Sequence, residues 1–348
     1  MKEQRGVKTY KEILSQGEVW ESTLKNAHNQ RNNVSEWINQ KHDQVIFTGC
    51  GSTYYLSLSA AKHWQRITGQ NAIALPGSEI WLYPEVSLVA KEPLLAAVSR
   101  SGETTETINA IEKYNSLYSK KWLTVSCYAD SQMALEAPVK LLTTGAEEDS
   151  VAQTRSFSSM FILTQYLANI AAKNNKQIEE LQYLPDIFKK LIDRYESTAK
   201  NIADNDQYQH FVFLGSGLNY GLASEVMLKM KEMSISVSEV FHFMEFRHGP
   251  MSMITPNSLV IGLISDTGKE EEKKVLNDMK QLGATTMALI ENAKGDEADH
   301  IIELESKVSE LSRGALYLPV LQLIAFYRSM SKGLNPDRPT NLEAVVHL

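Results

Sequence analysis

The chain of 348 residues is poor in cysteine, with only Cys50 and Cys127. Neither belongs to a C-x-x-C pair, so the sequence supports neither a zinc site nor a disulfide framework, and we expect no metal. The longest apolar stretch, 316–326, contains Pro319 and Gln322 and is too short to span a bilayer. The N-terminus is polar and has no apolar signal-peptide core. We therefore expect a cytoplasmic protein without a membrane partner.

Positive charge is also scarce. The 35 Lys and Arg residues are outnumbered by 42 Asp and Glu, which gives a formal net charge of -7. A field of this sign disfavours a nucleic-acid partner. A small phosphorylated metabolite stays compatible with it, because local backbone dipoles can hold a phosphate. The length and the 43% hydrophobic content suit two domains of ordinary size.

An internal repeat is present. A Gly-x-Gly turn at 49–51 recurs at 215–217, and a strand end of the form Ser-x-Ser/Thr-Gly at 99–102 recurs at 265–268. The offsets agree, since 215 − 49 = 166 and 265 − 99 = 166. A common offset for two separate turns indicates duplication of a whole structural unit. Because the two copies differ in sequence at these turns, we expect only one of them to bind an anion.

Apolar runs of strand length alternate with segments of helical periodicity along the whole chain. This alternation predicts an α/β fold with parallel sheets and helices on both faces. The predicted strands are 45–48, 72–75, 93–98, 122–127, 139–142, 211–214, 260–264, 286–290 and 301–304. The predicted helices are 8–40, 52–68, 104–118, 158–172, 181–205, 220–233, 270–282 and 316–330.

The first Ser-x-Ser-Gly turn is the main candidate for an anion site. Ser99, Ser101 and Thr104 place three hydroxyls and free N–H groups where a strand passes into a helix, and a helix N-terminus favours negative charge. The alternative is that Ser101 or Thr104 only caps the helix, which explains one hydroxyl of the three. The turn at 49–53 is expected to add a second set of hydrogen-bond donors opposite the turn at 99–104. It has no third glycine at the dinucleotide position, which disfavours a nicotinamide or flavin cofactor.

The helix over 220–233 carries Glu225, Lys229 and Glu232 at positions i, i+4 and i+7, which share one face. These charges are either a solvated face with Glu–Lys pairs or part of a site. His248, which precedes Gly-Pro at a chain reversal, is a candidate proton carrier beside Glu232. The loop at 149–155 is either a plain polar loop with a helix cap or a backbone surface against a ligand.

Four motifs occur in a characteristic order: Thr-Gly-Cys-Gly-Ser-Thr, Ser-Arg-Ser-Gly-Glu-Thr, Glu-x3-Lys-x2-Glu and Arg-His-Gly-Pro. Together they resemble the sugar isomerase (SIS) domain family, in particular the isomerase half of glucosamine-6-phosphate synthase and stand-alone amino-sugar-phosphate deaminases and deglycases. The resemblance implies two tandem SIS subdomains, each a flavodoxin-like αβα sandwich. The implied order is a helical segment 1–44, a first domain 45–195, a second domain 196–334 and a tail 335–348.

The resemblance also implies residue roles. Glu232 matches the base that moves a proton between C1 and C2, and His248 matches a histidine linked to ring opening that reaches in from the other subunit of a homodimer. Lys229 and Glu225 match the charged face behind the base, and Val151 matches a backbone stretch against the sugar. The residues implied to bind the phosphate end of the sugar are Gly51, Ser52, Thr53, Ser99, Arg100, Ser101 and Thr104.

Three departures from the family pattern bear on function. The chain starts Met1-Lys2 without a cysteine nucleophile, so we expect no glutamine-dependent synthesis. Ala344 stands where the synthase tail has an imine-forming lysine, with Glu343 and His347 nearby. Arg100 replaces a glutamine of the synthase, where it can pair with phosphate or with Glu103.

We therefore expect a cofactor-independent enzyme, a glucosamine-6-phosphate deaminase that isomerises the sugar and releases ammonia. A fructosamine-6-phosphate deglycase and a simple aldose–ketose isomerase are close alternatives. A sensor that binds the sugar phosphate without turnover is a different class. The presence of both Glu232 and His248 favours catalysis, since a sensor needs only the hydroxyl-rich turn.

Overall fold

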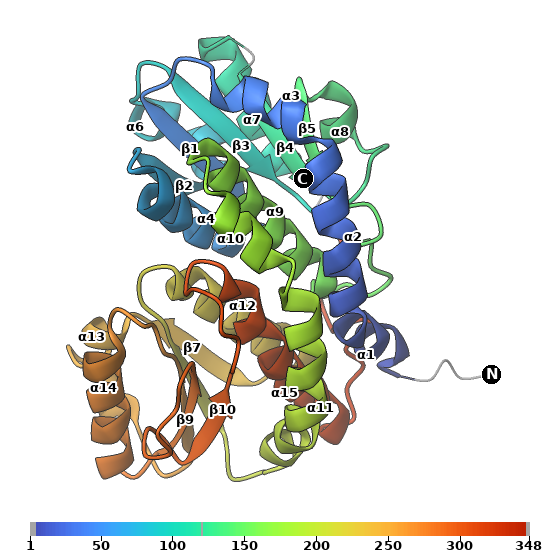
Figure 1. The fold of residues 1–348 in the computed structure, drawn as a ribbon. Helices are drawn as coiled ribbons and strands as arrows, with labels where there is room; N and C mark the ends of the chain where they lie inside the picture. The colour runs from blue at the N-terminus through green and yellow to red at the C-terminus, as the bar shows by residue number, and fades with distance from the viewer. Residues whose placement is uncertain (1–4, 120, 346–348) are drawn as a thin grey trace. The chain divides into compact units, whose positions relative to one another are not determined.

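The computed structural model describes residues 5–119 and 121–345, which fall into two compact units (Figure 1). The first unit consists of Ser15–Glu148, Gln153–Pro185 and the residues from Glu343 onward. The second consists of the residues up to Leu14, the short segment Asp149–Ala152, and Asp186–Leu342.

The first unit is built on a parallel five-stranded sheet with the order β2-β1-β3-β4-β5. Its strands are continuous apolar runs, as expected for strands buried on both faces. β1 lies between β2 and β3, so that Thr48 is paired with both Leu75 and Ala97. The strands are β1 (Gln44–Gly49), β2 (Ala72–Pro76), β3 (Pro93–Val98), β4 (Trp122–Ser126) and β5 (Val139–Leu142).

Helices cover both faces of this sheet. Ile46, Leu95 and Trp122 of the strands pack on one face against α5 (Gly77–Leu82), α7 (Thr105–Leu117) and α8 (Gln132–Glu136). On the other face, Phe47 of β1 meets Trp64 of α4 (Ser52–Thr68) edge to face, and α4 packs on α9 (Arg155–Ala171). The remaining helices of this unit are α2 (Gln16–Asn29), α3 (Arg31–Ile38), α6 (Pro84–Ser87) and α10 (Asn175–Leu181).

The second unit repeats the topology, with the sheet order β10-β9-β8-β6-β7. Read from β7, this is the same order as in the first sheet, and β6 begins at His210, which is 166 residues after Gln44 (210 − 44 = 166). The strands are β6 (His210–Leu214), β7 (Val237–Phe241), β8 (Ser258–Leu263), β9 (Thr285–Ile290) and β10 (His300–Glu303).

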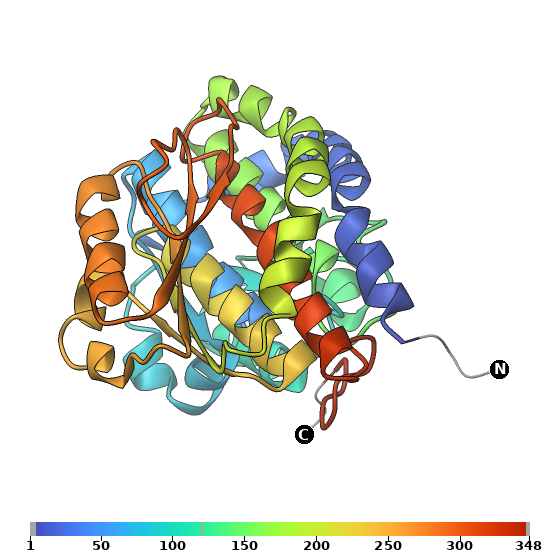
Figure 2. The same cartoon turned by 90° about the horizontal axis from the view of Figure 1, so that it is seen from below.

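One face of the second sheet is covered by α13 (Phe243–Phe246) and α14 (Lys269–Gln281), whose apolar side chains pack on Val212, Val260 and Ala288. The opposite face is covered by α12 (Asn219–Ser234) and α15 (Leu318–Ser331), which pack against each other (Figure 2). The other helices of this unit are α1 (Val7–Leu14), α11 (Leu184–Ala203), η1 (Pro250–Met253) and η2 (Arg313–Tyr317).

The structure confirms the predicted α/β class, with two parallel sheets each sandwiched by helices in a flavodoxin-like manner. The predicted helical segment 8–40 is three helices, broken at Ser15 and Gln30. The edge strand β7 was not predicted, because its half-exposed residues and central Glu239 break the apolar run that marks a buried strand. None of the described helices is both long and apolar enough to cross a bilayer.

Candidate functional site

The Gly-x-Gly turn of the first unit connects β1 to α4. A Cβ on Gly49 would lie 2.5 Å from Oγ1 of Thr53, so glycine is required for the helix to follow the strand this closely. Gly51 has φ 55° and ψ −123°, a conformation open essentially to glycine alone. The Thr53 hydroxyl donates to the Cys50 carbonyl at 2.9 Å and accepts from the Cys50 N–H at 2.9 Å. Thr53 therefore fixes this turn, and Ser52 opens α4 beside it.

The second turn of the first unit connects β3 to α7 through Ser99–Thr104. The Gly102 N–H donates to Oγ of Ser99 at 3.0 Å, and the Glu103 N–H donates to Oγ of Ser101 at 3.2 Å. Thr104 is the N-cap residue of α7, but its side chain makes no capping hydrogen bond and lies 3.5 Å from Oγ of Ser99. None of the three hydroxyls therefore caps α7, and each can still donate a hydrogen bond to a ligand.

Arg100 points away from this turn. Its guanidinium is 3.4 Å from the Glu148 carboxylate and donates to the carbonyl oxygen of Ala344 at 3.0 Å. Among the described residues no ion pair joins Arg100 to Glu103, whose carboxylate accepts from the Gln132 N–H at 2.6 Å. Arg100 and Glu148 are both nearly inaccessible, so this cation and this carboxylate neutralise each other inside the unit.

Glu148 is the centre of a buried network that the sequence did not reveal. Besides Arg100, its carboxylate accepts from the N–H and hydroxyl of Thr154 at 2.7 and 2.8 Å, and from the N–H and hydroxyl of Ser156. It therefore takes the role of the missing cap at the start of α9. The pKa of the nearby Cys127 thiol is raised well above its ordinary value, mainly by burial and secondly by the charge of Glu148. This cysteine is therefore unreactive.

The Val151 loop lies in the second unit. The Val151 N–H donates to the carbonyl of Asp337 at 3.1 Å, and the buried Glu12 carboxylate of α1 accepts from the N–H groups of Asp149 and Ser150 at 2.7 and 3.2 Å. Asp337 in turn caps α1, accepting from the N–H and hydroxyl of Thr9 at 2.8 Å. The loop is therefore held between an N-terminal helix and the C-terminal tail, two segments that no local motif connects.

The repeated turn of the second unit begins like the first. The Gly268 N–H donates to Oγ of Ser265 at 2.8 Å, which matches Gly102 and Ser99. Here, however, the Glu272 carboxylate accepts from the N–H and the hydroxyl of Ser265, at 2.7 and 3.0 Å. Glu272 is 3% exposed, and its burial raises its pKa from 4.5 to about 7 although the hydrogen bonds from Ser265 oppose the shift. A carboxylate of the chain itself thus occupies, in the second copy, the Ser265 donors that correspond to those of Ser99.

The charged face of α12 is assembled as its spacing predicts. Nζ of Lys229 is 3.3 Å from Oε1 of Glu225 and forms a second, short ion pair with the Glu232 carboxylate. The Glu225 and Lys229 side chains are 0% and 1% exposed, whereas that of Glu232 is 19% exposed. Burial disfavours the charged lysine, but the two carboxylates outweigh it and raise the pKa of Lys229. The face is therefore a buried charge cluster with one accessible carboxylate, and the solvated-face alternative is wrong.

His248 is not part of this cluster. It is exposed in the turn between α13 and η1, its N–H donates to the Glu245 carbonyl at 3.0 Å, and Gly249 follows with φ 121°. Within residues 5–119 and 121–345 no hydrogen bond or ion pair joins His248 to Glu232, and no set of three His, Cys, Asp or Glu side chains is arranged to hold a metal ion. His347 lies outside the described residues.

Curated relatives are similar in sequence to this chain over most of its length. The glutamine–fructose-6-phosphate aminotransferase (isomerizing) of Pyrobaculum aerophilum is 31% identical over 313 residues, covering 87% of this chain and 51% of that protein. The enzyme of the same name from Sulfurisphaera tokodaii is 29% identical over 305 residues, covering 87% and 50%. The chain therefore spans about half the length of the curated relatives it matches.

Two solved structures illustrate the structural likeness. The tagatose-6-phosphate ketose/aldose isomerase of Escherichia coli superposes with a TM-score of 0.87 at 22% identity, over 97% of this chain and 96% of that one, which supports the fold alone. The glucosamine-6-phosphate deaminase of Thermotoga maritima gives a TM-score of 0.73 at 26% identity, over 94% and 100%. The family model of the SIS domain matches twice, at residues 38–170 and 206–329. Because these two matches cover most of the chain and each takes in one of the two sheets, this chain belongs to the SIS domain family.

Proposed function

We propose that the protein isomerises a 2-amino-2-deoxyhexose 6-phosphate and releases ammonia, as an amino-sugar-phosphate deaminase. The observation that carries the proposal is the state of Glu232. It is the one accessible carboxylate of a cluster whose other members, Glu225 and Lys229, are buried. Burying a lysine and a glutamate carries a desolvation cost, and charges buried in this way gather at catalytic sites.

The phosphate end of the substrate is assigned to the first unit. Ser99, Ser101 and Thr104 present three hydroxyls beside the start of α7, and in the described residues these hydroxyls contact only their own turn. Donors at a helix N-terminus suit a phosphate dianion. In this proposal Gly51, Ser52 and Thr53 form the facing wall, with Thr53 fixing the turn, and Arg100 acts from behind through Glu148 and the Ala344 carbonyl.

The proton transfer is assigned to Glu232. In the open-chain aldose its carboxylate removes the proton on C2 and returns it to C1, while one amino proton passes to O1, which gives the imine of the ketose. Water then adds to C2 and ammonia leaves, so the products are a ketose 6-phosphate and ammonia. The ion pair with Lys229 fixes the carboxylate in one orientation, which a base serving two adjacent carbons requires. His248 is proposed to assist ring opening, and the Val151 backbone to lie along the sugar.

Ala344 favours release of the amine over transfer chemistry that needs a lysine. An alanine methyl group cannot form an imine with a ketose, so a route through a tail lysine is closed at this position. The likeness to the Thermotoga maritima deaminase supports the same choice. A simple aldose–ketose isomerase is the second candidate, since the proton transfer itself does not need the amine.

An ammonia-release assay tests the proposal. The panel contains glucosamine 6-phosphate, its C4 epimer galactosamine 6-phosphate, a fructosamine 6-phosphate carrying an amino acid, and tagatose 6-phosphate as a substrate without nitrogen. We expect ammonia from at least one 2-amino sugar phosphate and none from its unphosphorylated form. Conversion of tagatose 6-phosphate, which is a ketose, into the aldose 6-phosphate, without ammonia from any substrate, would establish the simple isomerase instead.

A mixing experiment tests the proposed homodimer. Glu232→Gln and His248→Ala are each expected to be inactive alone. If His248 acts on the site of the partner subunit, mixing the two variants restores one intact site in half of the dimers, about a quarter of wild-type activity at equal amounts. Absence of any recovery after subunit exchange, verified by labelled subunits, contradicts a site shared in this way.

A further inference from the structure

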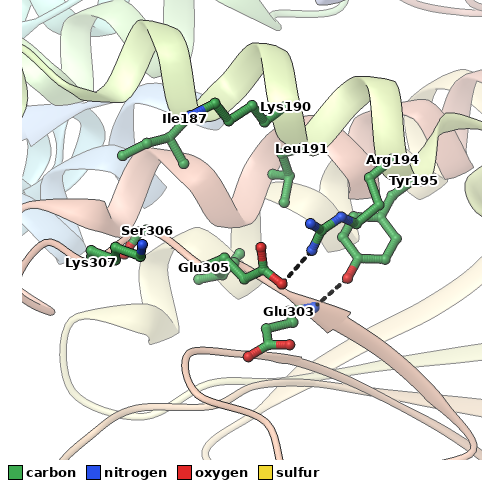
Figure 3. A pocket seen from close by; sticks show the side chains of 10 residues that line it. Ile187, Lys190, Leu191, Arg194, Tyr195, Glu303, Glu305, Ser306 and Lys307 are labelled. Carbon is green, nitrogen blue, oxygen red and sulfur yellow. Dashed lines mark hydrogen bonds and ion pairs between the residues drawn. The ribbon is translucent and has the colours of Figure 1, made fainter.

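A cavity of about 260 Å³ lies in the second unit, where β10 ends beside α11 (Figure 3). Its apolar side includes Leu191 and Leu304. Its charged lining residues are Lys190, Arg194, Lys307, Glu303 and Glu305. None of the lining residues belongs to α12 or to the two Ser-x-Ser/Thr-Gly turns, so the cavity is separate from the residues proposed for the reaction. The carboxyl end of a parallel strand is a usual ligand position in open α/β sheets.

The cavity carries a surplus of positive charge in a protein of net charge -7. Arg194 pairs with Glu305 at 2.6 Å, whereas neither Lys190 nor Lys307 has a carboxylate within ion-pair distance in the described chain. The cavity as it stands has three cations against two carboxylates, Glu303 and Glu305, and Glu303 also accepts from the Ala293 N–H at 3.1 Å. A ligand that takes the place of Glu305 on Arg194 leaves three cations against Glu303 alone, an excess of two positive charges. A dianion matches that excess.

The wall that carries Glu305 and Lys307 is fixed in an uncommon conformation. Glu305 and Lys307 have φ values of 45° and 57°, in the left-handed region that residues other than glycine rarely adopt. The buried Glu291 carboxylate holds this backbone by accepting from the N–H groups of Ser306 and Lys307, both at 3.0 Å. On the strand side, the Glu303 N–H donates to the Tyr195 hydroxyl at 3.0 Å, as Figure 3 shows. Strain that the surroundings enforce is typical of binding loops.

We propose that this cavity binds a small dianionic metabolite, whose anionic group replaces Glu305 on Arg194 while Lys190 and Lys307 take the second charge. The replaced ion pair is weak, because both side chains are about half exposed, at 49% and 48%. Arg194 offers two parallel N–H donors to a carboxylate or phosphate. Phosphate monoesters and dicarboxylates share the required chemistry, and the cavity volume limits the ligand to a small molecule.

Calorimetric titration of the full chain with three anions tests this site. Succinate represents the dicarboxylates, glycerol 3-phosphate the phosphate monoesters, and acetate is the singly charged control. We expect saturable binding of one dianion per chain with a dissociation constant below about 10 mM, much weaker binding of acetate, and loss of affinity as salt is added. Binding of succinate alone or of the monoester alone identifies the source of the dianion.

Two variants of one helix give a matched comparison. Lys190→Glu is expected to weaken dianion binding at least tenfold, because it places a negative charge in the cavity. Lys189→Glu makes the same change of net charge at the neighbouring exposed position of α11, which does not line the cavity, and should bind like the wild type. Ser101→Ala should leave succinate binding unchanged, which separates this site from the proposed phosphate turn. Equal effects of Lys190→Glu and Lys189→Glu, or no saturable binding of either dianion, would overturn the proposal.

Discussion

The turns that follow β3 and β8 share one hydrogen bond and differ in what their donors contact. In both, a glycine N–H donates to the serine three residues earlier. After β8 the helix begins directly at Lys269, which brings Glu272 onto Ser265. After β3 two further residues, Glu103 and Thr104, precede the helix, and no carboxylate contacts the serine hydroxyls in the described residues. A two-residue difference in loop length thus separates a turn whose serine hydroxyls contact no carboxylate in the described residues from one whose serine is bonded to Glu272.

The helices that follow the Gly-x-Gly turns also differ, and here it is the second copy that carries the charged residues. Subtracting 166 from Glu225, Lys229 and Glu232 gives Ser59, His63 and Arg66 of α4. The second copy therefore carries the buried acid–base cluster, and the first carries none at the equivalent positions. Each copy therefore has one chemical feature that the other lacks, hydroxyl donors free of a carboxylate contact in the first and a buried charge cluster in the second.

The largest effect should come from the carboxylate of the second unit. Glu232→Gln keeps the shape of the side chain but removes the base, so we expect kcat to fall roughly a thousandfold with little change in sugar-phosphate affinity. The control is Arg66→Gln, at the exposed equivalent position of α4, which should leave kcat near the wild-type value. Similar losses in both variants would remove the functional difference between the two helices.

Glu272 should make the stability of the protein depend on pH. Its pKa of about 7 in the folded state lies above the 4.5 of the free side chain, so the fold favours the protonated form. Its contribution to stability is complete below about pH 4.5 and is lost as the pH rises through about 7, a change of about 3 kcal/mol.

Chemical denaturation across this pH range measures that contribution. Glu272→Gln should flatten the decline in the free energy of unfolding, while Glu270→Gln, an exposed neighbour on the same turn of α14, should keep it. An unchanged decline in Glu272→Gln would mean that this carboxylate does not titrate as its burial requires.

The hydroxyls of the two turns should differ in their effect on binding. Ser101→Ala is expected to weaken sugar-phosphate binding by about 2 kcal/mol, roughly thirtyfold, because a hydrogen bond to a charged group is lost. Thr267→Ala, at the equivalent position of the second copy (101 + 166 = 267), should not change it. Isothermal titration with phosphorylated and unphosphorylated sugars measures both, and equal weakening for the two sugar types would contradict a role in phosphate binding.

The smallest effect should be the same in both copies. Gly51 and Gly217 have φ values of 55° and 56°, and a Cβ on either would meet no atom within 4 Å. Alanine at either position should therefore destabilise the fold through backbone strain alone, by roughly 1–2 kcal/mol. Thermal unfolding measures each, and clearly unequal losses would show that the two Gly-x-Gly turns are no longer equivalent.

Much of the fold could be predicted because its signals are local. Buried parallel strands give unbroken apolar runs such as that before Gly49, and glycine is required wherever a helix follows a strand as closely as at Gly49 and Gly215. The edge strand β7 had no such run and was missed. Helical spacing correctly placed Glu225, Lys229 and Glu232 on one face but could not tell whether that face is buried.

Local sequence is enough to define the duplicated strand–turn–helix plan, since periodicity and glycine turns depend on neighbouring residues. Which charges meet depends on packing between distant segments. Arg100 pairs with Glu148 rather than with Glu103, Glu272 accepts from Ser265, and Glu12 and Asp337 hold the loop at 149–152. The physical reason is that a buried charge must find a partner in space, and the distance along the chain says nothing about which partner packing brings within reach.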